Sequence, residues 1–222
     1  MGLEKLWDKE LKVFNKYNNE STDFGIVKVF GIILLALRFA TLPALIVLQI
    51  GGVKDAVSNG REKTIDFYVT AKLLISVLIV ILLIPSNKDN VWSMISVIWV
   101  FYSLLETLLY IITPIYCSQS FIKPKSYKRA FILGVLNYFE IIFYFAFLYF
   151  YFDAIKISNT CESGPFSNLV YVYHSLIAGL TIGFGDYIPS GGVGMYLSIL
   201  QGVIFFLFII VFFNYNFSNI KK

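Results

Sequence analysis

The chain carries long apolar runs separated by short polar segments. Five of these runs cover approximately residues 26–50, 67–84, 91–113, 131–152 and 195–214. About twenty helical residues cross a hydrocarbon core of roughly 30 Å, so each run is long enough, or nearly so, for a transmembrane helix. A sixth apolar piece, at about 166–180, is too short to cross and leads directly into a glycine-rich segment. We therefore expect this piece to enter the membrane as a re-entrant helix.

The composition agrees with an all-α membrane protein. Hydrophobic residues make up 58% of the 222 residues and charged residues only 14%, which is too little charge to cover the surface of a soluble globule. The net charge of +4 resides in short segments between apolar runs, which favours contact with membrane lipids over nucleic acid. The sequence shows no Ser-His-Asp set, metal cluster or phosphate-binding loop. We expect neither an enzyme nor an organic cofactor.

The glycine-rich segment runs from Thr181 to Asp186 and has the sequence TIGFGD. A dehydrated cation needs several close oxygen ligands, and backbone carbonyls supply them when they point at one axis. In an ordinary extended strand successive carbonyls point to opposite sides. Alternate residues must therefore enter the left-handed region, where glycine sits without steric cost. Gly183 and Gly185 occupy such alternate positions.

This segment closely resembles the selectivity filter of the tetrameric potassium channel family, and the two-pore-domain subfamily also uses its GFGD spelling. The resemblance extends over 131–222, in the order outer helix, pore helix, filter and inner helix. It implies a potassium-selective channel that conducts K+ passively and holds the ions at the filter. The filter residues would be Thr181, Ile182, Gly183, Phe184 and Gly185, with K+ bound at the first four. Ile182 and Phe184 would turn their side chains away from the axis.

The resemblance also implies an assembly. One pore loop supplies one wall of the conduction path, so we expect four identical chains to form a homotetramer. Tyr173 occupies the place of a family aromatic that bonds the filter aspartate, and we expect its hydroxyl to bind Asp186 as filter support. Phe205 replaces the glycine at which many relatives bend the inner helix, and Gly202 lies one turn away.

Three ionisable residues lie near the middle of apolar runs: Arg38, Glu106 and Glu140. Charges at this depth are costly and call for partners or water. Our hypothesis is that Arg38 pairs with Glu106 or Glu140 and couples the peripheral helices to the pore. A static pair or a snorkelling arginine is an equally open interpretation. We expect Lys72, near the end of a run, to snorkel toward the membrane surface.

The pattern predicts four regions of the chain. They are an amphipathic interfacial helix or tail at 1–25, a three-helix transmembrane region at 26–116, a basic cytoplasmic linker at 117–130 and the pore domain at 131–222. Five crossings with a cytoplasmic linker put the N-terminus outside a cell (plasma or cytoplasmic) membrane. The four lysines of the tail favour the cytoplasm instead. If they lie there, one of the first three runs fails to cross, and the shortest, 67–84, is the candidate.

Gating is less defined by the sequence than conduction. No run has basic residues at every third position, so we expect no standard voltage sensor. A leak conductance remains open, as does control by lipid, tension, pH, the filter or a separate regulatory subunit. Two alternative functions also remain open: a less selective cation channel, and a non-conducting regulatory or interaction membrane protein with a vestigial pore.

Overall fold

The computed structural model describes residues 11–19, 24–41, 60–83, 90–117, 127–158 and 166–209. The protein is an all-α membrane protein, as expected, with one short strand pair added. The helices besides the helical residues 11–19 are α2 (Ile26–Ala40), α4 (Gly60–Leu83), α5 (Val91–Tyr116), α6 (Tyr127–Tyr151), α7 (Asn168–Gly179) and α8 (Gly191–Leu207). The strands are β1 (Ile155–Ile157) and β2 (Tyr187–Pro189), which pair antiparallel.

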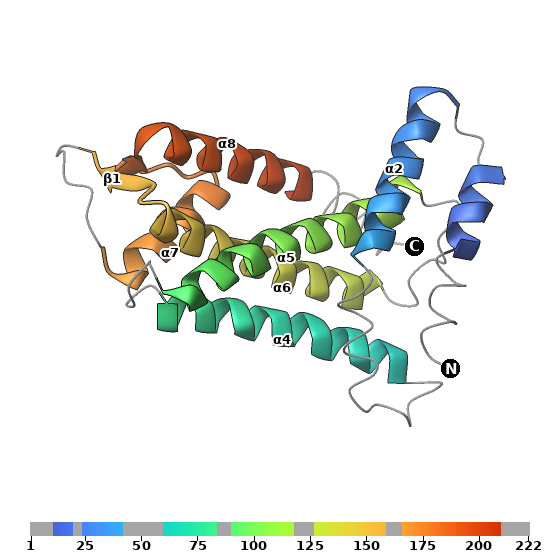
Figure 1. Ribbon diagram of the computed structural model, residues 1–222, viewed down its shortest axis with the longest axis horizontal. Helices are drawn as coiled ribbons and strands as arrows, with labels where there is room; N and C mark the ends of the chain where they lie inside the picture. Colours follow the sequence, from blue (N-terminus) through green and yellow to red (C-terminus); the bar gives the residue numbers. More distant parts are fainter. Residues whose placement is uncertain are drawn as a thin grey trace.

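Helices α4, α5 and α6 lie side by side, and α7 and α8 pack at one end of α6 (Figure 1). Helices α4 and α6 run in the same direction. At their starts Arg129 pairs with Asp66 at 2.8 Å, and beyond the end of α6 the Asn168 side chain donates to the Val80 carbonyl at 3.1 Å. Helix α5 runs the opposite way and packs against α6 more than against α4. The three helices therefore form a bundle. In it α4 lies alongside α6, which is the outer helix of the expected pore domain.

Two helices of the described ranges are both long and apolar enough to cross a membrane, at Val91–Thr113 and Lys128–Tyr151. They correspond to the runs at 91–113 and 131–152. Helix α4 begins seven residues before the run at 67, and most of its charged residues lie in this added part. It lies alongside α6 over its length. Helix α8 is a shorter apolar helix of 17 residues, and residues 210–222 lie outside the described ranges.

The first apolar run differs from expectation. Helix α2 has 15 residues, about 22 Å of helix, and lies across the end of the bundle at which α5 ends (Figure 1). The Tyr116 hydroxyl donates to the Val27 carbonyl at 3.0 Å, and the Tyr102 hydroxyl donates to the Thr41 carbonyl at 2.9 Å. The start of α2 is thus beside the end of α5, whereas five crossings require it beside the start of α5. The direction of α2 along α5 thus differs from the one that five crossings require, and whether the run at 26–50 crosses the membrane stays a prediction, because residues 42–50 lie outside the described ranges.

The helix at 11–19 explains this placement. Its Tyr17 is fully buried against Leu35 of α2 and Cys117 at the end of α5, so α2 finds apolar cover from protein at this end of the bundle. Gly31 permits the contact, because a Cβ there would meet the Tyr17 ring. Lys12 and Lys16 therefore lie near the end at which α4 and α6 begin. These two lysines are at the same end of the bundle as the basic residues Lys128 and Arg129 of α6.

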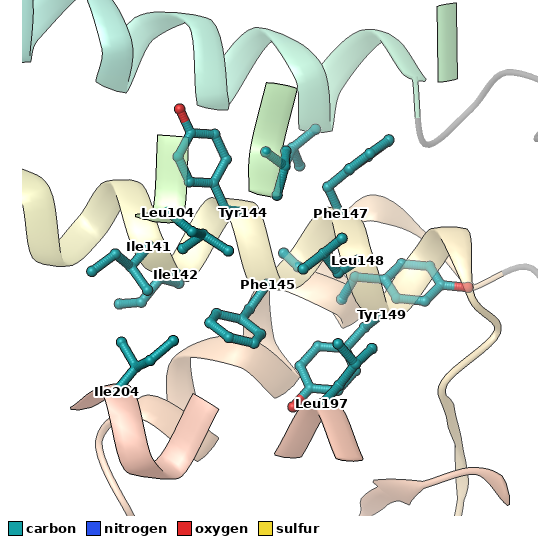
Figure 2. Packing of buried hydrophobic residues seen from close by; sticks show 14 of the residues in the cluster. Leu104, Ile141, Ile142, Tyr144, Phe145, Phe147, Leu148, Tyr149, Leu197 and Ile204 are labelled. Carbon is teal, nitrogen blue, oxygen red and sulfur yellow. The ribbon is translucent and has the colours of Figure 1, made fainter. Parts of the chain in front are cut away.

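Helix α6 is the centre of the hydrophobic core. From Ile141 to Phe150 nearly every side chain is buried, because α4, α5, α7 and α8 surround this stretch. Figure 2 shows Phe145 and Tyr149 on the side of α8, with Tyr144 and Phe147 on the opposite side. A helix that is apolar on all sides is typical of a buried core element. The outer helix of the pore domain is thus enclosed by its own chain.

Gly194 sets the distance between α8 and the turn after α6. A Cβ at Gly194 would meet the Ala154 carbonyl oxygen, a backbone atom that also accepts a hydrogen bond from the Ser190 N–H at 2.8 Å. We expect Gly194→Ala to destabilise the detergent-solubilised protein by about 1–3 kcal/mol, seen as a lower melting temperature, because the backbone cannot move aside freely. Gly192→Ala is the matched control, since a Cβ there meets nothing within 4 Å. Equal melting temperatures for the two variants would contradict this prediction.

Candidate ion-binding site

The candidate site begins where α7 ends. Helix α7 has 12 residues, too few to cross a membrane. After it the chain unwinds gradually: the Leu180 N–H donates to the Leu176 carbonyl at 2.9 Å, and the Ile182 N–H donates to the Ile177 carbonyl at 2.9 Å. The segment 181–186 therefore continues directly from the carboxyl end of the helix, where the helix dipole is negative. This end of α7 favours a cation beside the segment.

The backbone of this segment alternates in conformation. The φ angles are +57° at Thr181, +60° at Gly183 and +78° at Gly185. The alternation expected for the two glycines is confirmed, and Thr181 extends it by one position. An L-residue with a side chain in the left-handed region costs about 1–2 kcal/mol, so Thr181 carries strain that glycine would not. The neighbouring structure must hold this conformation in place.

The carbonyl oxygens of 181–185 are not used by the fold. Among the described residues, no backbone or side-chain donor bonds to any of these oxygens. By contrast the next carbonyl, that of Asp186, accepts a hydrogen bond from the Ser158 N–H at 2.9 Å. The segment is exposed in a single chain, so these oxygens are free of partners from the fold and accessible to another ligand. The segment is well suited to bind a cation.

The side chains of the two residues between the left-handed positions are exposed in a single chain. Ile182 is 49% exposed and Phe184 is 67% exposed. A Cβ at Gly183 or Gly185 would meet nothing within 4 Å. Ile182 and Phe184 are therefore only partly covered by protein within this chain alone. One chain forms the back of the site and leaves its other sides open.

At the outer end of the segment Asp186 is held by two donors. Its carboxylate accepts hydrogen bonds from the Tyr173 hydroxyl and, at 3.0 Å, from the Tyr187 N–H. Desolvation raises the pKa of Asp186, but these hydrogen bonds outweigh it and lower the pKa below its ordinary value. The contact between Tyr173 and Asp186 expected from the sequence is present. Pairing of β2 with β1, with Tyr187 opposite Ile157, fixes the chain that leaves the site.

Phe205 supports the end of α7 from behind. It is fully buried, and a Cβ at Gly179 would meet its ring. Tyr138 of α6 completes the contact: its hydroxyl donates to the Gly179 carbonyl at 3.1 Å, and its ring lies 4.7 Å from that of Phe205 between centroids. Helix α8 continues unbroken through Gly202 and Phe205. The position where relatives bend is therefore occupied by a packing residue.

A buried polar network joins the three helices of the pore domain. The Gln201 amide of α8 donates to the carbonyl of Ser175 on α7 at 2.9 Å and to its hydroxyl oxygen at 3.0 Å. The Tyr149 hydroxyl of α6 donates to the Gln201 side-chain oxygen at 2.7 Å, and the Ser175 hydroxyl donates to the Ile142 carbonyl at 2.8 Å. Sequence reasoning missed this network. The available signal was a glutamine inside an apolar run, which needs partners.

The intramembrane charges are arranged differently from our hypothesis. Lys72 lies 3.1 Å from Glu106 and 3.2 Å from Glu140, whereas the Arg38 guanidinium lies over the Tyr110 ring at 4.4 Å from its centroid. Within the described ranges the partner of both glutamates is Lys72 and not Arg38. The expectation that Lys72 snorkels is also wrong, because only 4% of the residue is exposed. Its ammonium finds two carboxylates inside the bundle, which outweighs the gain from reaching water.

A comparison with known protein families matches the part of the chain that contains α6, α7 and α8. Residues 131–222 match the family model described as "Ion channel", which covers about two fifths of the chain. No curated protein and no solved structure matches the chain. The match supports an ion-channel pore in this part of a membrane protein, and ion channels are not an enzyme class. Helices α2, α4 and α5 lie outside the match.

The hydrogen bond between Tyr173 and Asp186 can be tested by titration. Because the pKa of Asp186 is lowered, its hydrogen bonds stabilise the protein above the ordinary carboxyl pKa, and this stabilisation is lost as pH falls through the pKa of Asp186 in the folded protein. We expect Tyr173→Phe to raise the Asp186 pKa toward its ordinary value and to lower the melting temperature at neutral pH but not at strongly acidic pH. Tyr151→Phe, which removes a hydroxyl at the end of α6, is the control. A difference in melting temperature that does not change with pH would count against this assignment.

Proposed function

We propose that the protein is a potassium-selective ion channel that conducts K+ passively through a filter formed by residues 181–185 of four identical chains. The observation that carries this proposal is the alternation of left-handed residues at Thr181, Gly183 and Gly185, together with five successive carbonyls that accept no hydrogen bond from the described residues. Such an alternation would direct successive carbonyl oxygens to one side of the chain. Rings of such oxygens replace the hydration shell of K+.

The ions would bind between the carbonyls of Thr181, Ile182, Gly183 and Phe184, with the Thr181 hydroxyl adding an oxygen at the inner end. Four copies supply the oxygens that one copy lacks. The four α7 helices would direct their negative ends toward the same axis, which favours cations over anions. Asp186 and Tyr173 support the outer end.

The exposed apolar surface of the pore domain supports assembly into a homotetramer. Ile182, Phe184 and a row on α8 are exposed in a single chain, including Tyr196 at 75% and Phe206 at 64%. A row beside the filter can pack against the neighbouring copies around the axis. Such packing would also supply the protein surface that Ile182 and Phe184 lack within one chain.

The distribution of basic residues supports an orientation in the cell membrane. Lys12, Lys16, Lys128 and Arg129 lie at the end of the bundle at which α4 and α6 begin, and Asp186 lies toward the other end. Basic segments favour the cytoplasmic side. The filter would then open outward, and the amphipathic tail would lie on the inner membrane surface.

Purified protein in liposomes tests the proposal directly. We expect a K+ flux that exceeds the Na+ flux many-fold and a particle mass of four chains by light scattering. Equal K+ and Na+ fluxes would replace K+ selectivity by a less selective cation channel. Tetramers without flux under all lipid and pH conditions would favour the non-conducting regulatory function.

Gly183→Ala tests the filter backbone itself. The φ of +60° at Gly183 makes a side chain there cost about 1–2 kcal/mol, although the chain leaves open space for a Cβ. We expect the variant to assemble normally and to lose about tenfold or more of its K+ over Na+ preference, since 1.4 kcal/mol corresponds to a factor of about ten. The flux ratio in liposomes measures this. Gly192→Ala is the matched control, and an unchanged flux ratio in Gly183→Ala would refute the proposed filter.

A further inference from the structure

Three helices meet at one buried ammonium group. Lys72 of α4 lies 3.1 Å from the carboxylate of Glu106 on α5 and 3.2 Å from that of Glu140 on α6. The exposed fractions of the three side chains are 5%, 1% and 0%. We call these residues the charge triad. It joins the two helices outside the pore domain to the outer helix of that domain.

The charge triad is not neutral when all three groups are ionised. Two carboxylates and one ammonium leave one negative charge in the middle of the bundle. An uncompensated charge in an apolar interior is expensive, and such a group takes up or releases a proton instead. Release of the Lys72 proton would leave two negative charges, so uptake by a carboxylate is the step that neutralises the cluster.

No other described cation faces the cluster. Helix α4 adds the Tyr68 hydroxyl, α5 adds Tyr102 near it, and α6 adds Tyr144 beside Glu140. Helix α7 faces α6 with His174, whose ring packs on Tyr149 at 4.7 Å between centroids, and α8 faces it with the neutral Gln201. The remaining pair of these helices, Asp66 with Arg129, lies at their partly exposed starts, and Arg38 of α2 lies over Tyr110. Among the described residues, Lys72 is thus the cation that forms an ion pair with these two carboxylates.

The two carboxylates differ in their hydrogen bonds. The Tyr68 hydroxyl lies 2.6 Å from each oxygen of Glu106 and donates its one proton to that carboxylate, and the Lys72 ammonium donates to it at 3.1 Å. The Tyr144 hydroxyl lies near Glu140, but within the described ranges neither Glu140 oxygen has a hydrogen bond of good distance and angle. Its only close charged partner is the shared Lys72. Glu140 is thus the carboxylate that gains most from holding a proton.

We propose that the charge triad is a proton-binding site in which Glu140 accepts the proton, and that this proton weakens the attachment of α4 to the outer helix of the pore. In the step a proton from water forms an O–H bond on one Glu140 oxygen, and no covalent bond breaks. Lys72 then remains with Glu106 and with the Thr107 hydroxyl at 2.8 Å, both on α5. The charge pair that crosses to α6 is lost.

The consequence for conduction rests on the proposed function. Helix α6 contacts the pore helix and the inner helix through Tyr138, Tyr149 and Ile142. A change in how α4 holds α6 is therefore transmitted to the elements that support the filter. The proton site makes K+ flux depend on pH through a group that does not line the conduction path.

The proton itself is measured without reference to flux. Infrared difference spectra of the full-length protein in liposomes, recorded over a pH titration, should show the C=O stretching band of a buried protonated carboxylic acid. We expect Glu140→Gln to abolish this band and the control Asp66→Asn, which neutralises the partly exposed pair of the same two helices, to leave it unchanged. Absence of the band at every pH in the unaltered protein, or its survival in Glu140→Gln, would overturn the proton site.

Flux tests the second half of the proposal. We expect K+ flux in Glu140→Gln to be independent of pH and equal to the flux of the unaltered protein at low pH, because the amide mimics the protonated carboxyl. Asp66→Asn should keep the pH dependence. A flux that responds to pH equally in Glu140→Gln and the unaltered protein would overturn the coupling. If no preparation conducts K+, the proposed function fails, while the infrared band still decides whether the triad binds a proton.

Discussion

A backbone carbonyl cannot both complete the fold and bind an ion, and the pore domain depends on this constraint. The carbonyls of 181–185 accept no hydrogen bond from the described residues and are exposed in a single chain. The conformation that keeps them available also strains Thr181. Such a segment persists only when the surrounding structure determines its shape. The contacts around it therefore follow from the need to hold an otherwise unfavourable backbone.

These contacts reach the segment at both ends and from behind. At the inner end Tyr138 and Phe205 fix the last turn of α7 at Gly179, and at the outer end the donors to Asp186 and the pairing of β1 with β2 fix the exit. Between them Gln201 ties α8 to α7. All of these contacts come from residues between 138 and 205, which lie within the part of the chain that matches an ion-channel family model. The pore domain is thus one cooperative unit, with α6 as its centre.

The sequence predicted this unit better than the rest of the chain, for a physical reason. Glycine spacing and the position of Tyr173 act locally, because conformational freedom and a nearby hydrogen bond depend on few residues. The partner of Glu140 depends instead on how helices are rotated and stacked, which hydropathy does not encode. Arg38 and Lys72 both lie in apolar runs, yet only Lys72 belongs to α4, the helix that packs alongside α6. Likewise an apolar run at 26–50 does not reveal that Tyr17 provides a protein surface to cover α2.

Three polar contacts of different character fix α4 to the pore domain along its length. The pair of Asp66 with Arg129 is partly exposed, and such pairs contribute about 0–1 kcal/mol. The bond from Asn168 to the Val80 carbonyl is neutral and does not respond to charge. The contact of Lys72 with Glu140 is buried, so its strength depends strongly on whether the carboxyl is ionised. Any signal that acts through α4 on the pore is therefore most sensitive at the middle contact, where one proton changes the interaction most.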